Sequence, residues 1–131
     1  MRKNISPRSE KGQATTEFAV VLPILVVLLF GIIQFGIAFK DYLSLTDAVR
    51  AGARKAAVSR NLSDPVGATQ TAVRNAAADL DQAKLPDPGV VSNWQPGTDV
   101  QVSAQYPFRI SLFGIPVVTG NLKSSTTERV E

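Results

Sequence analysis

The chain of 131 residues contains no cysteine and no histidine. Without cysteine it forms neither disulfides nor thiolate nucleophiles, and without histidine it lacks the usual acid/base catalyst near neutral pH. The two absences also remove most ligands of transition metals, so we expect no metal and no cofactor. Sequence motifs of serine hydrolases, P-loop nucleotide-binding proteins and zinc proteases are missing as well. We therefore expect no enzymatic activity; a hydrolase with paired acids is disfavoured because the acids fall mostly at expected caps, turns and polar helix faces.

Charged residues are also scarce, at 19% of the chain, and they are unevenly placed. Residues 1–12 account for the whole formal net charge of +3, because they hold Arg2, Lys3, Arg8 and Lys11 against Glu10. The remainder is neutral overall and lacks the basic surface of a nucleic-acid-binding protein. We therefore expect no nucleic-acid partner.

A long uncharged segment runs from Phe18 to Phe39. As a helix it is roughly 33 Å long at about 1.5 Å per residue, enough to cross the hydrocarbon core of a bilayer. A core helix is usually shorter, and a signal peptide has a shorter apolar region that ends at a small-residue cleavage site. We predict a transmembrane helix over residues 13–39. The positive-inside rule places the basic leader, residues 1–12, in the cytoplasm and residues 40–131 on the other side of the membrane.

Four residues interrupt the apolar character of this segment. Pro23 removes one helical hydrogen bond, which we expect to kink or loosen the first turns. Gly31 and Gly36 offer flat surfaces to a neighbouring helix, and Gln34 between them can hydrogen-bond such a neighbour. Scattered small residues are equally typical of membrane helices, so both interpretations stay open.

Beyond the span the apolar spacing predicts that the same helix continues, with one face formed by Leu45, Val49, Gly52, Ala53 and Ala56. The small residues Ala48, Gly52 and Ala56 recur every four positions, which allows a second element to pack closely. A face that covers the protein's own domain and a stripe that contacts another subunit are both compatible with this spacing.

A second helix is expected to begin at Pro65, with Asp64 as its N-cap. Its apolar stripe extends to about Lys84 and is formed by Val66, Val73, Ala76, Ala77 and Leu80. The proline- and glycine-containing segment Leu85 to Gly89 ends the helix.

Past Pro88 the apolar period changes to two, which is typical of strands. We expect a short strand near Val90, an alternating strand from Val100 to Phe108, an apolar loop from Phe113 to Val117 and a closing strand from Leu122 to Val130. The fold class is therefore membrane-anchored α+β: a long N-terminal helix, a second helix and a small antiparallel sheet. The aromatic residues expected in the core are Trp94, Tyr106 and Phe108.

The most specific pattern lies where the leader meets the span. Gly12 ends the leader, Gln13 follows it, and Glu17 and Phe18 open the apolar segment. A carboxylate at membrane depth is costly, so such residues tend to have a function. Taken alone, Glu17 also suits the first turn of a helix, where the macrodipole favours an acid.

This junction resembles the prepilin-peptidase site of type IV pilins and pseudopilins, in the short-leader form of Flp/Tad pilus proteins. The blocks Glu17–Pro23, Gly31–Gly36 and Ala48–Ala57 resemble, in order, the N-terminal region of TadE-like proteins, the minor pseudopilins of the tight-adherence pilus. Gln34 and Ala51 depart from the family, since relatives carry acidic residues there.

The resemblance implies cleavage between Gly12 and Gln13, which makes Glu17 the fifth residue of the mature chain. It further implies a pilin-like fold and a minor pseudopilin of a type IVb Flp/Tad system, acting in pilus assembly or initiation and in surface adherence. The implied partners are the prepilin peptidase, other pilins and pseudopilins, the inner-membrane assembly platform and membrane lipid. The implied location is the bacterial inner membrane, as a single-pass protein with a periplasmic C-terminal domain, or the extracellular pilus after processing. The alternative is a single-pass anchor whose outer domain is a binding module of another envelope complex.

Overall fold

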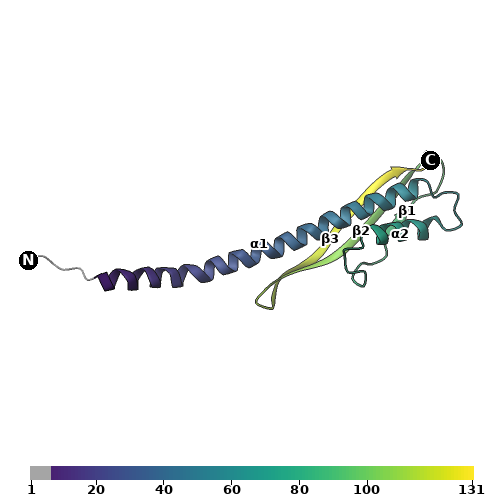
Figure 1. Ribbon diagram of the computed structural model, residues 1–131. Helices are drawn as coiled ribbons and strands as arrows, with labels where there is room; N and C mark the ends of the chain where they lie inside the picture. The colour runs from purple at the N-terminus through teal and green to yellow at the C-terminus, as the bar shows by residue number, and fades with distance from the viewer. Residues whose placement is uncertain (1–6) are drawn as a thin grey trace, which may run out of the picture.

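The computed structural model describes residues 7–131. Residues 1–6 of the basic leader and the side chains of residues 7–11 lie outside the described part. In chain order the elements are α1 (Pro7–Ala57), α2 (Pro65–Ala76), β1 (Gly89–Val91), β2 (Asp99–Leu112) and β3 (Ile115–Arg129) (Figure 1). This is the predicted α+β arrangement of a long helix, a second helix and a small antiparallel sheet.

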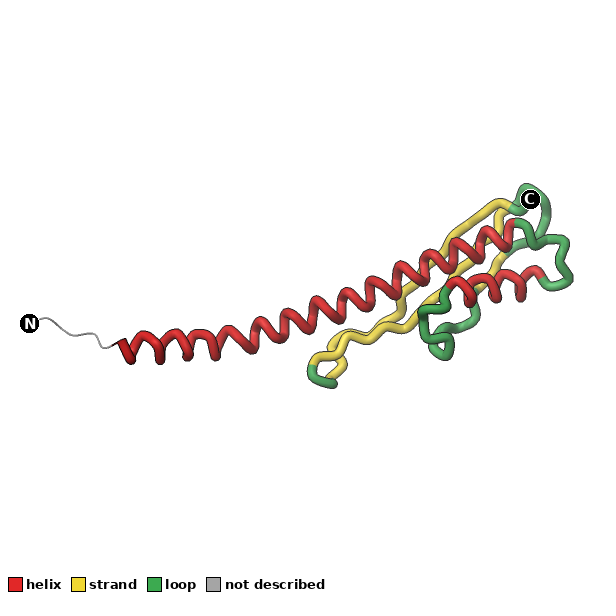
Figure 2. Tube along the Cα trace, viewed as in Figure 1, coloured by secondary structure: helices red, strands yellow, loops and turns green. Residues whose placement is uncertain are grey.

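α1 is a single helix of 51 residues that continues through Pro23. The proline therefore does not break the helix, because it removes only one hydrogen bond and the neighbouring turns keep theirs. The first half of α1 projects away from the rest of the protein, and the second half lies along α2 and the sheet (Figure 2). The predicted continuation of the helix beyond the apolar segment is thus confirmed.

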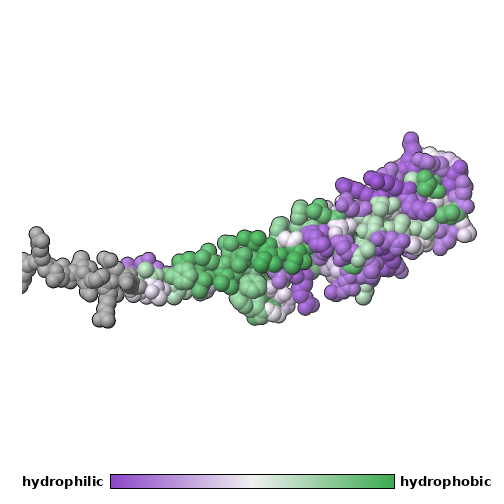
Figure 3. Space-filling model, in the orientation of Figure 1, coloured by the Kyte–Doolittle hydropathy of each residue, from purple (hydrophilic) through white to green (hydrophobic). Residues whose placement is uncertain are grey.

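The projecting half of α1 is largely uncovered by the rest of the chain, and Phe113 of the β2–β3 hairpin contacts it at Phe30. Within the described residues α1 is long and apolar enough to cross a membrane, and its most apolar 18-residue window has a mean hydropathy of 2.8 with 0% of it buried. Figure 3 shows this half as an apolar band that gives way to a polar surface over the C-terminal domain. A core helix of a soluble domain would be covered, so the core-helix alternative does not fit.

The sheet is antiparallel in the order β1-β2-β3. Alternate residues of β2 face the helices and are buried, as the period of two predicts. They complete a core whose helical part comes from α1, α2 and the turns after α2; its members are Leu45, Ala48, Val49, Ala53, Ala56, Val73, Ala77, Leu80, Leu85, Val100, Val102, Ala104, Tyr106 and Val130. Of the aromatic residues expected there, Tyr106 is buried, Trp94 packs on the core partly buried, and Phe108 is half-buried.

The second helix is shorter than predicted. Its start is confirmed, since the backbone N–H of Gly67 donates to Asp64 Oδ1 at 2.8 Å. It ends at Ala76 rather than near Lys84, and Val66 and Ala76 are exposed. The Gln82 side-chain amide donates to the carbonyl of Ala77 at 2.7 Å and thereby satisfies an acceptor at the helix end, so that turns replace further helix.

The predicted apolar loop from Phe113 to Val117 is also wrong. The connection is a turn centred on Phe113 and Gly114, with φ values of 48° and 84°, and β3 begins at Ile115 instead of Leu122. Positive φ at both central residues matches the twist of the flanking strands, as in a type I′ hairpin. The sequence does not indicate this hairpin, because phenylalanine is not a residue that usually signals such a turn.

α1 and α2 approach closely at the stripe of small residues. A Cβ added at Gly52 would collide with Cγ2 of Val73, a fully buried residue with a stiff β-branched side chain. The predicted close packing of a second element against Ala48, Gly52 and Ala56 is therefore observed within the chain.

Gly52→Ala is expected to lower the free energy of unfolding by about 1–3 kcal/mol, because the added methyl group overpacks the contact with Val73. The control is Gly36→Ala, where the new Cβ has no atom within 4 Å. Thermal unfolding in detergent, followed by the fluorescence of the single tryptophan, measures the difference. Equal stability of the two variants would contradict the packing described here.

Candidate functional site at the start of the long helix

All four residues singled out at the junction lie in the first turns of α1. Gly12, Gln13, Glu17 and Phe18 are helical and exposed, so the peptide bond between Gly12 and Gln13 is part of an open helical turn. Spacing of four residues brings Gln13 and Glu17 onto one face. The sequence pattern is thus assembled on a single helix surface.

The carboxylate of Glu17 has a neutral partner in its own chain. Gln13 Nε2 donates to Glu17 Oε1 at 3.1 Å, and Thr16 Oγ1 donates to the carbonyl of Gly12 at 2.9 Å. Among the side chains that the structure describes, no cation pairs with Glu17. One amide hydrogen bond leaves the negative charge of Glu17 uncompensated, so the carboxylate can accept a cation from another molecule.

The fold gives no reason for glycine at position 12. A Cβ there would have no heavy atom within 4 Å, and Gly12 is not among the residues with positive φ. Glycine inside a helix costs roughly 0.5–1 kcal/mol relative to alanine. Packing and backbone conformation within the described residues therefore leave room for a side chain at position 12.

The two glycines of the apolar segment are equally open. A Cβ added at Gly31 or Gly36 would touch nothing within 4 Å, so neither residue is needed for packing inside this chain. Gln34 between them lines an open groove between α1 and the β2–β3 hairpin, together with Asp41, Lys84 and Arg109. Both glycines remain available to another helix, which keeps the helix-contact interpretation open.

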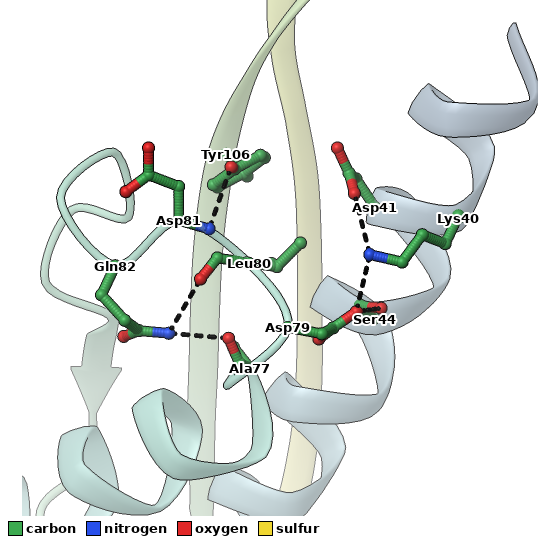
Figure 4. A network of polar contacts seen from close by, with 9 residues as sticks. All are labelled: Lys40, Asp41, Ser44, Ala77, Asp79, Leu80, Asp81, Gln82 and Tyr106. Atoms are coloured by element: carbon green, nitrogen blue, oxygen red, sulfur yellow. Dashed lines mark hydrogen bonds and ion pairs between the residues drawn. The ribbon is translucent and has the colours of Figure 1, made fainter. Parts of the chain in front are cut away.

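A polar network fastens the segment after α2 to α1 at the first turn beyond the apolar run (Figure 4). Lys40 Nζ lies 3.0 Å from Asp79 Oδ2 and 3.5 Å from Asp41 Oδ1, and Ser44 Oγ donates to Asp79 Oδ2 at 2.6 Å. The hydrogen bond from Ser44, followed by that from Lys40, lowers the pKa of Asp79 below its usual value, and the hydrogen bond to Asp79 raises the pKa of Lys40. The charged forms of both groups are therefore favoured at neutral pH.

This network of Lys40, Asp41, Ser44 and Asp79 was not predicted from the sequence. Its acid and base are far apart in the chain, and only the position of Lys40 directly after the apolar segment marked it as a boundary residue. The same segment after α2 is held to the sheet by a further hydrogen bond, from the backbone N–H of Asp81 to the hydroxyl oxygen of Tyr106 at 3.2 Å. Three-dimensional contacts of this kind leave no local pattern in a sequence.

The described residues offer no metal-binding cluster to set beside the helix site, since groups of three or more histidine, cysteine or acidic side chains that could hold a metal ion are absent among them. Several charged side chains of the domain form ion pairs, such as Lys84 with Asp81 at 3.0 Å.

The fold consists of an α+β domain at one end of a long helix, and the uncovered apolar half of this helix fits a single-pass membrane protein. Comparison with protein families gives a match between residues 12–54 and the family described as TadE-like protein. The N-terminal part of the chain is thus similar to TadE-like proteins, which confirms the resemblance over this segment. The match begins at Gly12 and ends in the packed half of α1. No curated protein and no solved structure matches the chain significantly.

Proposed function

We propose that the protein is a minor pseudopilin of a type IVb Flp/Tad pilus system that is cleaved between Gly12 and Gln13 by the prepilin peptidase. The observation that carries this proposal is the TadE-like segment, residues 12–54, on a helix whose apolar half is uncovered. The role is structural: the protein acts in assembling or initiating the pilus and thereby in surface adherence. Its partners are the peptidase, other pilins and pseudopilins, the inner-membrane assembly platform and membrane lipid.

The uncovered half of α1 requires an apolar environment at every stage. Before processing this environment is the inner membrane, which residues 13–39 cross. After processing, the same surface packs against helices of other subunits, and the open positions Gly31 and Gly36 allow close approach.

Cleavage changes the electrostatics at Glu17. It removes the basic leader and creates an α-amino group on Gln13. The amine of one subunit can neutralise Glu17 of its neighbour, so that neither ion is buried alone in a low-dielectric bundle. Among the described side chains Glu17 has a neutral amide partner and no cation within ion-pair distance, which supports this role.

The orientation follows from the charge of the leader, which keeps the N-terminus in the cytoplasm and residues 40–131 in the periplasm. The C-terminal residue Glu131 is exposed, and its backbone N–H is bound to the carbonyl of Ala57 at the outer end of α1. A reporter enzyme that is active only in the periplasm should therefore be active when fused after Glu131. Activity of a cytoplasm-specific reporter at the same position would contradict the proposed orientation.

The second candidate function is a plain single-pass anchor for a binding domain of another envelope complex. Such an anchor fits the same helix and domain but needs no processing. Cleavage after Gly12 therefore separates the two functions.

Gly12→Val is expected to leave the full-length precursor on an immunoblot, because the bulkier side chain next to the scissile bond does not fit the peptidase. The matched control is Gly31→Val, the same substitution at another open position of α1. The control should be processed normally, since it lies far from the cut. Normal processing of Gly12→Val would contradict the proposed cleavage site.

Glu17→Gln is expected to be inserted and cleaved normally and yet to fail to support pili or surface attachment. Removing the carboxylate leaves the neighbouring amine unpaired, a loss of about 3–5 kcal/mol per contact if the pair is fully buried and less at the level of the lipid headgroups. Complementation of a deletion strain measures the effect. The matched control is Asp47→Asn, an exposed acid in the packed half of α1. Wild-type piliation by Glu17→Gln would show that Glu17 serves only the helix start.

A further inference from the structure

A second apolar surface lies at the end of the β2–β3 hairpin, in residues 110–118, here named the hairpin tip. The sequence holds no charged residue between Arg109 and Lys123. The large side chains of the tip are turned outward, with exposed fractions of 70% for Phe113, 69% for Ile115 and 63% for Val117. A protein surface of this kind marks a contact with an apolar partner.

The hairpin tip lies beside the apolar half of α1. The ring centroids of Phe113 and Phe30 are 5.7 Å apart with their planes tilted by 51°. Phe30 belongs to the uncharged segment from Phe18 to Phe39 and not to the part of α1 above it. In Figures 1 and 2 the hairpin accordingly runs back along α1 toward the N-terminus, and Figure 3 shows an apolar surface where the two elements meet.

The position of Phe30 gives the depth of the tip. Phe30 lies about 20 Å along the helix from Glu17, so in a hydrocarbon core of about 30 Å it is about 10 Å inside the outer boundary. Strands rise about 3.3 Å per residue, which places Arg109 roughly 13 Å above Phe113 and outside the hydrocarbon. The part of the hairpin that reaches below the membrane boundary therefore carries no charged residue.

Basic side chains gather just above this level. Arg109 and Lys84 line the groove that they share with Ala38 and Asp41 of α1, and Lys40 follows the apolar run directly. On β3, Lys123 is the first charged residue after the tip; it is exposed and pairs with Gln105, roughly 13 Å further up the hairpin than Arg109. An apolar tip below a level of basic residues matches a bilayer, whose acyl chains lie below the phosphate groups.

The backbone of the tip is compatible with shallow insertion. β2 and β3 pair with each other up to Leu112 and Ile115, so one edge of each strand is satisfied within the hairpin. Pro116 has no N–H group, which removes one donor from the outer edge of β3. A depth of about 10 Å lies within the 5–10 Å range of interfacial insertion, whereas an open sheet edge deeper in the hydrocarbon would be costly.

We propose that the hairpin tip inserts into the outer leaflet of the bilayer that α1 crosses and forms a second membrane contact of the domain. The occupant is lipid, because the contact between Phe113 and Phe30 holds the tip against a helix segment that lipid surrounds. Two contacts, one helical and one from the hairpin, fix the tilt of the domain on the membrane. The proposal rests on the membrane span of α1 and not on the pseudopilin role.

The absence of cysteine makes a direct test available, because each single cysteine variant carries one label. The full-length protein with Ile115→Cys is labelled with an environment-sensitive fluorophore and reconstituted into vesicles of phosphatidylcholine and phosphatidylglycerol. Quenching by nitroxides on the acyl chains is compared with quenching by a water-soluble paramagnetic complex. Ser125→Cys is the matched control: an exposed position on the same strand, beyond Lys123. Val117→Cys repeats the test at a second exposed position, and Leu28→Cys reports on α1 itself.

The expected result is loss of most fluorescence to the acyl-chain nitroxides at positions 115, 117 and 28, with a blue-shifted emission, and quenching only from water at position 125. Water quenching at positions 115 and 117 with lipid quenching at position 28 would overturn the proposal and leave the span intact. Protection of positions 115 and 117 from both quenchers would show that protein, such as a second copy, covers the tip, and would also overturn it. Absence of lipid quenching at position 28 would overturn the membrane span and the insertion together.

Discussion

The structure depends on the continuity of α1 across a change of environment. One helix presents apolar side chains on all sides in its first half and a single buried stripe in its second half. Apolar side chains on all sides require a surrounding apolar medium, whereas a stripe requires one packed partner. The boundary between the two regimes is at Lys40, the first charged residue after the span. Beyond Lys40, α2 and the sheet pack against the second half of α1, which carries this stripe.

The C-terminal domain is small and uses the helix as the centre of its core. Many of its buried helical residues are alanine and glycine. The stability of the domain therefore depends more on close packing of its helices than on large buried side chains. Gly52 lets α2 reach α1, and the pair of Lys40 with Asp79 holds the segment after α2 at the base of the domain. The C-terminal half of α1 is therefore part of the domain that it carries.

The sequence was sufficient for the features that rest on periodicity and composition. The apolar run, the stripe from Leu45 to Ala56, the cap at Asp64 and the alternating strand from Val100 were all predicted and are present. The early end of α2 was missed because it depends on the side chain of Gln82, which folds back on the helix end. The hairpin at Phe113 was missed because its turn has a residue with unfavourable backbone preference. For the candidate site, the spacing of Gly12, Gln13 and Glu17 could be recognised in the sequence. The open space around Gly12 could be seen only in the structure, because it depends on where the rest of the chain lies.

The central claim is that the chain is a membrane-inserted precursor that is cut after Gly12. Mass spectrometry of the N-terminal peptide of the protein purified from its native membranes tests this claim most directly. The account predicts a mature chain that begins at Gln13, either with a free amine or cyclised with loss of ammonia; the cyclised form would retain the cleavage but remove the amine proposed to pair with Glu17. A chain that retains the leader in cells producing pili would contradict the claim.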